Sequence, residues 1–168
     1  GSGGVCCVPH LLGSGTPQND QESRGALLGL SMDHTRGHIL RSVIEALGYS
    51  LRENVEAVEA ALAQRIVEVI AVGGANRAAL VRQIKADTTG RPITAPELEE
   101  ATATGAALLA GVGVGIYSNT RQAARSLRIN SQIYVPSPDA QATYDRRYHG
   151  VYLKLHRALA DVNRELTS

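Results

Sequence analysis

The chain has 168 residues, which is enough for one ordinary domain with its own hydrophobic core. Its 17 basic and 16 acidic residues give a net charge of +1, so we expect neither nucleic acid nor a membrane surface as a partner. The longest apolar run, residues 106–116, is too short and too rich in Gly to span a bilayer.

Two short strands are predicted at the start of the chain, over residues 4–9 and 24–31, with a loop rich in turn-forming residues between them. Cys6 and Cys7 are adjacent, and neighbouring strand residues point to opposite faces, so we expect unpaired, buried thiols in a reducing cytoplasm. The only Met is Met32. We therefore expect residues 1–3 (GSG) to be the remnant of a cleaved tag and the domain to run from residue 4 to 168.

The clearest predicted element is a helix that begins near Asp33 or Thr35, either of which can act as the N-cap. Apolar residues then recur every three or four positions from Leu40 to Leu62. Gly48 lies within this pattern, where it costs about 1 kcal/mol relative to Ala. It therefore marks either a bend or a close contact.

Residues 66–72 are almost continuously apolar, which is typical of a central strand covered on both faces. This strand leads into Gly73 and Gly74, and a helix is predicted from about 76 to 88, ended by Gly90. A ligand can approach a backbone that lacks Cβ atoms. The end of a parallel strand is also where α/β folds usually bind nucleotides. A plain tight turn is the alternative interpretation.

The remaining pattern continues to alternate strands with helices, which predicts an α/β layered domain. We expect a short strand over 91–94, with Pro96 suited to the first turn of a helix over 97–112. A short helix opening at Asn119 or Thr120, an extended segment over 133–136 and a closing helix over 139–166 follow. The closing helix carries Tyr144, Tyr148 and Tyr152 on one face, which we interpret as packing rather than a binding surface.

Other candidate sites are weaker. His34 and His38 are four residues apart, as in some metal sites, but no third ligand has suitable spacing, so we expect no metal there. Residues 111–115 (GVGVG) follow a helix and lack the spacing of a dinucleotide-binding fingerprint. The basic residues of the closing helix are interpreted as a solvated face.

Two blocks of sequence identify a resemblance. Residues 25–30 (GALLGL), a seven-residue spacer and residues 38–45 (HILRSVIE) resemble the second signature of the FGGY carbohydrate kinases. Residues 72–87 (VGGANRAALVRQIKAD) resemble the adenosine motif of the same family. Residues 9–25, 99–110 and 134–148 resemble further segments of these kinases in the right order, so the resemblance covers nearly all of residues 4–168.

The resemblance implies the C-terminal, nucleotide-side lobe of such a kinase, with the ribonuclease-H-like (actin-like ATPase) fold and a central mixed sheet flanked by helices. It implies that Gly73, Gly74, Ala75 and Ala78 bind the adenosine part of ATP. Relatives often carry Ser or Asn where this chain has Ala78, so only packing is expected at that position. Relatives also have a charged pair where this chain has Ser14 and Gly15.

The parent enzyme implied by the resemblance transfers the ATP γ-phosphate to a hydroxyl of a pentulose or polyol. No stretch of this chain resembles the family's sugar-binding residues, its Asp general base or its phosphate-binding loops. Catalytic residues are therefore expected elsewhere, with Mg²⁺ held mainly by the missing N-terminal lobe and the substrate phosphates. We expect the 168-residue piece to be inactive alone. Homodimer formation is left open, and the alternative is a non-catalytic interaction module with an actin-like fold.

Overall fold

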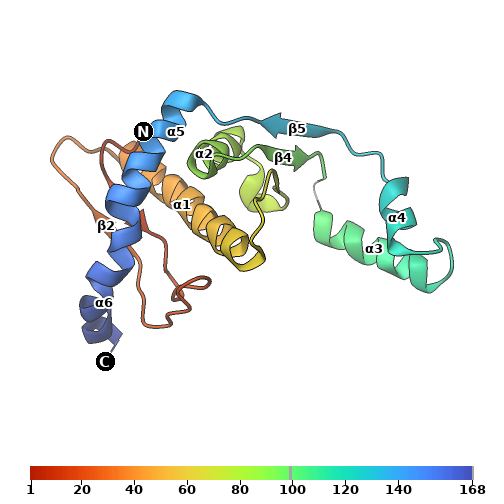
Figure 1. Cartoon of the computed structure of the whole chain (residues 1–168), viewed down its shortest axis with the longest axis horizontal. Coiled ribbons are helices and arrows are strands. Elements are labelled where there is room, and N and C mark those ends of the chain that lie inside the picture. The colour runs from red at the N-terminus through yellow and green to blue at the C-terminus, as the bar shows by residue number, and fades with distance from the viewer. Residues whose placement is uncertain (99, 168) are drawn as a thin grey trace.

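The computed structural model of the chain describes residues 1–98 and 100–167 and shows helices packed around short strands (Figure 1). Glu99, part of one segment that carries the family resemblance, lies outside the described residues. Among the described residues, none of the helices combines the length and the apolar character needed to cross a membrane. The α/β class predicted from the sequence is confirmed.

The strands form two separate sheets. The two strands predicted near the start of the chain are present, and β1 (Cys6–Val8) and β2 (Ala26–Leu28) pair in antiparallel fashion. β3 (Val69–Ile70), β4 (Ile93–Pro96) and β5 (Ser131–Tyr134) form a three-stranded sheet in that order. β4 is parallel to β3 and antiparallel to β5, so the sheet is mixed, as expected.

One strand prediction is wrong in its extent and position. The apolar run 66–72 contains only the two strand residues of β3, at one edge of the described sheet rather than at its centre. Ile70 is 64% exposed, so this strand is not covered on both faces. Continuous apolar sequence indicated a buried strand, but β3 has a single neighbouring strand and only two paired positions.

The helices agree with the sequence pattern except near Pro96. Pro96 was expected in the first turn of a helix, but it is the last residue of β4. A terminal strand position suits a residue without an N–H group. The helices are α1 (Arg36–Leu62), α2 (Ala79–Thr89), α3 (Ala101–Gly113), α4 (Thr120–Ser126), α5 (Pro138–Arg147) and α6 (Leu153–Thr167).

The ends of these helices have local causes that the sequence shows. Thr35 is the N-cap of α1, and Gly90 ends α2 in a left-handed conformation with φ of 63°. The N-cap of α4 is Asn119, whose side chain accepts a hydrogen bond from the backbone N–H of Gln122 at 2.9 Å. Between α5 and α6 the chain makes a π-helical turn over Tyr148–Tyr152.

The main core is aromatic and lies between α1, α2 and the closing helices. Tyr49 of α1 and Ile84 of α2 pack with Tyr144, Tyr148 and Tyr152, and all five are at least 95% buried. The prediction that the tyrosine stripe serves packing is confirmed. With Phe and Trp absent from the chain, tyrosine supplies the large rings of this core.

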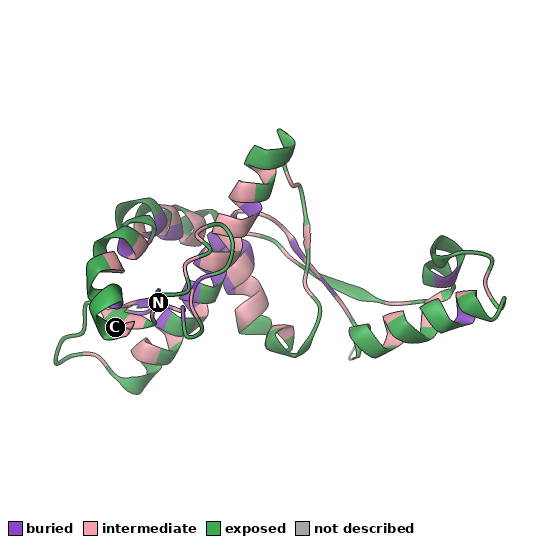
Figure 2. Ribbon diagram, turned by 90° about the horizontal axis from the view of Figure 1, so that it is seen from below, coloured by how far each residue is buried: buried purple, intermediate pink, exposed green. Residues whose placement is uncertain are grey.

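The helices α3 and α4 lie at the far end of the ribbon formed by β4 and β5, away from the other helices (Figure 1). Figure 2 shows both helices as mostly exposed. α3 is composed largely of Ala, Gly and Leu, yet its one buried residue among those described is Gly111. The β4–β5 ribbon therefore connects the helical body to a small, separate helical hairpin.

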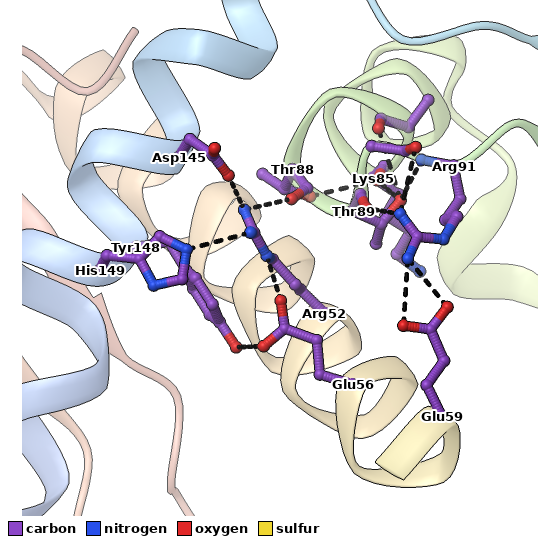
Figure 3. A network of polar contacts seen from close by, with 12 residues as sticks. Arg52, Glu56, Glu59, Lys85, Thr88, Thr89, Arg91, Asp145, Tyr148 and His149 are labelled. Carbon is purple, nitrogen blue, oxygen red and sulfur yellow. Dashed lines mark hydrogen bonds and ion pairs between the residues drawn. The ribbon is translucent and has the colours of Figure 1, made fainter. Parts of the chain in front are cut away.

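Polar contacts fix the segment that enters β3, and Figure 3 shows the Arg91–Glu59 pair among them. Arg91 Nη2 donates to both carboxylate oxygens of Glu59, at 2.8 and 3.1 Å, and its Nε donates to the carbonyl of Ile66 at 2.7 Å. Glu59 Oε1 also accepts the backbone N–H of Ile66 at 2.8 Å. The carboxylate is thus shared between an arginine and the backbone. This arrangement holds the end of α1 and the start of β4 at a fixed distance from β3.

Candidate functional site

A cleft of about 350 Å³ opens at the carboxyl ends of the parallel strands β3 and β4. Residues 71–73, which follow β3, form one wall, and residues 96–98, at the end of β4, form another. Asn76, Arg77 and Arg82 complete the lining. Ligands of open α/β sheets bind beyond the carboxyl ends of parallel strands, so this cleft is the candidate site.

The wall after β3 is a glycine turn. Gly73 has φ of 86°, a conformation that favours glycine, and the space around its missing Cβ is open. The backbone N–H of Asn76 donates to the carbonyl of Gly73 at 3.0 Å, closing a 3-10 turn over Gly74–Asn76. The side-chain amide of Asn76 donates to the carbonyl of Val72 at 2.7 Å. The turn therefore presents bare backbone to the cleft.

Two cations of α2 contact this turn through Asn76. Arg82 Nε donates to the carbonyl oxygen of Asn76, and Lys85 Nζ donates to its side-chain Oδ1 at 2.7 Å. Arg82 also reaches β5, where its Nη1 donates to the hydroxyl of Tyr134 at 3.1 Å. Burial lowers the pKa of Lys85, because the charged ammonium loses hydration.

The remaining charges lie at the mouth of the cleft. Arg77 is 71% exposed and approaches Glu100 at 3.7 Å. Glu97 is also exposed, and its backbone N–H donates to the carbonyl of Asn130 at 2.8 Å. The cleft thus offers guanidinium groups, one carboxylate and free backbone to a polar ligand. These groups are suited to binding and orienting a ligand.

The structure brings together part of the predicted site. Gly73 lines the cleft, and Gly74 and Ala75 follow it in the same exposed 3-10 turn. Ala78 is exposed and stands immediately before α2, outside the residues that line the cleft. Whether these four residues contact a nucleotide stays a prediction.

Sequence reasoning missed Arg82, Lys85 and Tyr134. Arg82 and Lys85 lie at helical spacing in the helix predicted after the Gly-Gly turn. This spacing places both cations on one face of the helix and could have suggested that they contact the turn. Tyr134 lies 52 residues from Arg82, and nothing in the sequence pattern links the two.

The histidine pair at the start of α1, with His34 before the helix and His38 in its first turn, has a structural role. His34 Nδ1 accepts the backbone N–H of Ser31 at 2.8 Å, and His38 Nδ1 accepts that of Thr35 at 3.1 Å. The two rings meet edge to face with centroids 5.4 Å apart. In residues 1–98 and 100–167, no group of three or more His, Cys, Asp or Glu side chains is placed to hold a metal ion.

Comparisons with known proteins give a consistent family. A model of the C-terminal domain of the FGGY family of carbohydrate kinases matches residues 1–114. The chain is 34% identical over 148 residues to a glycerol kinase of Trichlorobacter lovleyi, covering 88% of this chain and 30% of that protein. It is 41% identical over 118 residues to a glycerol kinase of Gloeobacter violaceus, covering 70% of this chain and 24% of that protein.

Solved structures agree with this result. The ligand-bound xylulose kinase of Lactobacillus acidophilus matches with a TM-score of 0.81 and 25% identity, covering 99% of this chain and 33% of that one. The xylulose kinase of Rhodospirillum rubrum matches with a TM-score of 0.74 and 28% identity, covering 98% of this chain and 32% of that one. The chain therefore spans about a third of the length of these proteins.

Proposed function

This chain belongs to the FGGY family of carbohydrate kinases, and we propose that it supplies the nucleotide-side wall of the ATP site in a parent kinase. Its fold is that of the C-terminal lobe of these actin-like enzymes. The parent enzyme would transfer the γ-phosphate of ATP to a hydroxyl of a small sugar or polyol. The observation that carries the proposal is the cleft at the carboxyl ends of β3 and β4, one wall of which is the Gly73 turn.

The residues present fit the adenosine part of ATP. The turn at Gly73 and Gly74 has open space where side chains would stand, so a ribose or a base can lie against the backbone. Arg77 is free to turn toward an anionic group at the mouth, since it is mostly exposed. ATP supplies the phosphoryl group. The residues of this chain would bind and orient the nucleoside end.

Phosphoryl transfer depends on positioning and on electrostatic stabilisation of the moving phosphate. We propose that Mg²⁺ is held mainly by the lobe that this chain lacks and by the nucleotide phosphates, as the family resemblance implies. Closure of the two lobes would complete the site and exclude water.

Cys6 and Cys7 are free thiols, which supports the expectation of a reducing, cytoplasmic compartment.

Titration of the isotopically labelled chain with ADP, followed by nuclear magnetic resonance, tests the proposal. We expect amide shifts confined to residues 71–77 and 97–98. Gly73→Val should weaken binding by about tenfold or more, because Val neither favours a positive φ nor leaves the wall open. Gly115→Val is the matched control, because Gly115 also has a positive φ and open surroundings but lies between α3 and α4.

Two results would count against the nucleotide role. Absence of shifts at millimolar ADP would favour the alternative of a non-catalytic interaction module. Equal weakening by the two valine substitutions would show that the turn at Gly73 has no special part in binding. If binding is found, a phosphorylation assay of the parent protein against pentuloses and polyols would identify the substrate.

A further inference from the structure

The glycine turn has few supports of its own. Among the described residues, no heavy atom other than those of the adjoining residues lies within 4 Å of the positions that Cβ atoms would occupy on Gly73 and Gly74, so no side chain supports the turn there. The only side chain of the turn with several partners is Asn76, which is half-buried. The conformation of the turn therefore depends on what holds Asn76.

Lys85 fixes the orientation of the Asn76 amide. An asparagine side chain can turn over and exchange its oxygen and nitrogen, but an ammonium group only donates hydrogen bonds. With Lys85 Nζ at 2.7 Å from Oδ1, the Asn76 amide nitrogen must face the carbonyl of Val72, to which it donates at 2.7 Å. The ammonium thus selects the amide orientation that ties the two ends of the turn together.

Lys85 is placed at a cost to stability. Its side chain is half-buried, and no carboxylate lies within ion-pair distance of it in the described part of the chain. Burial without an acidic partner disfavours the charged ammonium. A purely stabilising position would be better filled by an apolar side chain of the same length. Lys85 instead contacts the neutral side-chain amide of Asn76, and Asn76 lines the cleft.

Arg82 supports the same turn through the backbone of Asn76. Its Nε holds the backbone carbonyl of Asn76, and its guanidinium carbon lies 5.6 Å from the centroid of the Tyr134 ring. The Tyr134 hydroxyl in turn donates to Gln132 at 2.8 Å. The turn is therefore anchored to β5, a strand that follows the turn by more than fifty residues.

We propose that Lys85 and Arg82 are positioning residues that hold the Gly73–Asn76 turn, through Asn76, in the shape that receives the nucleotide. This inference rests on the proposed function. A turn that is already ordered loses less conformational entropy when a ligand binds, so preorganisation raises affinity without adding a contact. Lys85 is not among the residues that line the cleft, so it acts through Asn76.

The test compares ADP affinity with stability in Lys85→Met, which keeps the unbranched apolar stem of the side chain but removes its donor. We expect the Kd for ADP to rise about tenfold, as for loss of a hydrogen bond to a charged group. Thermal stability should stay equal or increase, because the unpaired ammonium is gone. A merely structural role predicts that affinity and stability fall together. Lys85→Arg, which can still donate to Oδ1, should restore most of the affinity.

Amide hydrogen exchange without ligand provides an independent readout. In Lys85→Met the amides of Asn76 and Arg77, which close the turn, should exchange about tenfold faster, whereas those in the middle of α1 should not change. Lys154→Met is the control, because Lys154 is exposed on α6. It should alter neither exchange in the turn nor the Kd.

The outcomes separate the two proposals. If the unmodified chain binds ADP and Lys85→Met binds equally well, or if exchange in the turn is unchanged, the positioning role is wrong and the nucleotide site stands. If the unmodified chain does not bind ADP, the nucleotide site is wrong and the positioning role falls with it. Because Arg82 also lines the cleft, its positioning role is tested by exchange without ligand: Arg82→Met should speed the exchange of the Asn76 and Arg77 amides. Unchanged exchange would remove Arg82 from the proposal.

Discussion

The guanidinium carbon of Arg52 lies 4.2 Å from the centroid of the Tyr148 ring, and both side chains bind the carboxylate of Glu56 (Figure 3). Arg52 Nε donates to Oε1 at 2.7 Å, and the Tyr148 hydroxyl donates to Oε2 at 2.8 Å. Arg52 Nη1 also donates to Asp145 at 2.5 Å and to the carbonyl of Thr88 at 3.3 Å. One side chain thus links α1 to α2 and to the closing helices.

Arg52→Lys should lower the free energy of unfolding by about 2 kcal/mol. A lysine keeps the charge, but its ammonium cannot stack on the ring and bind two carboxylates and a carbonyl at once. Urea unfolding followed by circular dichroism measures the change. Arg146→Lys is the control, since Arg146 is exposed on α5 and should change stability by no more than about 0.5 kcal/mol. Equal changes in the free energy of unfolding for the two variants would show that the planar guanidinium group of Arg52 is unimportant.

Gly48 marks a close contact between α1 and α2, one of the two roles that the sequence left open. A Cβ at this position would lie 3.0 Å from Cγ2 and 3.1 Å from Cβ of Thr88, which is fully buried. Gly48→Ala should therefore destabilise the protein by about 1–3 kcal/mol, although Ala favours a helix by about 1 kcal/mol. Thermal unfolding of the purified variant checks the sign.

Gly105→Ala is the matched control for that prediction. Gly105 lies inside α3, and in the described part of the chain no atom beyond its own turn of helix lies within 4 Å of its Cβ position. The same substitution there should stabilise by about 0.5–1 kcal/mol. Adding Thr88→Ala to Gly48→Ala should cost less than the sum of the two single changes, because Thr88→Ala makes room for the added Cβ, which in turn fills part of the space that is left. Additive costs would mean that the clash with Thr88 is not the cause.

Local patterns predicted most of the elements. The apolar spacing from Leu40 to Leu62 predicted α1, and Gly90 and Asn119 marked the helix ends where the structure has them. These features depend on residues a few positions apart, so a single sequence carries them. The same kind of local signal left the Gly-Gly turn as either a ligand site or a plain tight turn, and the structure places Gly73 in the wall of a cleft.

Features that depend on distant partners were not predicted. The run 66–72 looked like a covered strand, but its exposure depends on which strands pair with it. The contact of Arg82 with Tyr134 joins α2 to β5, and that of Lys85 with Asn76 depends on the angle at which α2 leaves the turn. Spacing along the chain does not determine either geometry.

Tyr49→Phe should stabilise the protein by about 1 kcal/mol. The Tyr49 hydroxyl is buried without a hydrogen-bond partner among the described residues, and such a group costs about 1–3 kcal/mol. Tyr144→Phe should instead destabilise the protein. The Tyr144 hydroxyl, in the same aromatic core, accepts a hydrogen bond from Arg41 at 2.9 Å and donates one to Glu45 at 3.1 Å. Urea unfolding of the two variants should give changes of opposite sign. A loss of stability in both would show that the Tyr49 hydroxyl is satisfied in solution.

Glu53 gives the stability a defined pH dependence. Its carboxyl group is half-buried against α6 and the loop between β1 and β2. This burial raises its pKa above the ordinary 4.5. Gln18 Nε2 donates to Glu53 Oε1 at 2.7 Å, which opposes the shift without cancelling it. The folded state therefore binds this proton more tightly than the unfolded state. The contribution of Glu53 to the stability of the folded protein is therefore lost as the pH rises through the range from 4.5 to its raised pKa.

Glu53→Gln removes this titration while keeping an acceptor for Gln18. At pH 7 the variant should be more stable than the unmodified chain, and below about pH 4 the two should converge, because Glu53 is then protonated in both states. The pH dependence of stability must be compared between the variant and the unmodified chain. Asp20 and Glu59 have lowered pKa values, so they make stability change with pH in the opposite direction. Glu22→Gln, an exposed control in the same loop as Gln18, should leave the whole profile unchanged. A stability difference for Glu53→Gln that does not vary between pH 4 and 7 would mean that burial of Glu53 does not determine this dependence.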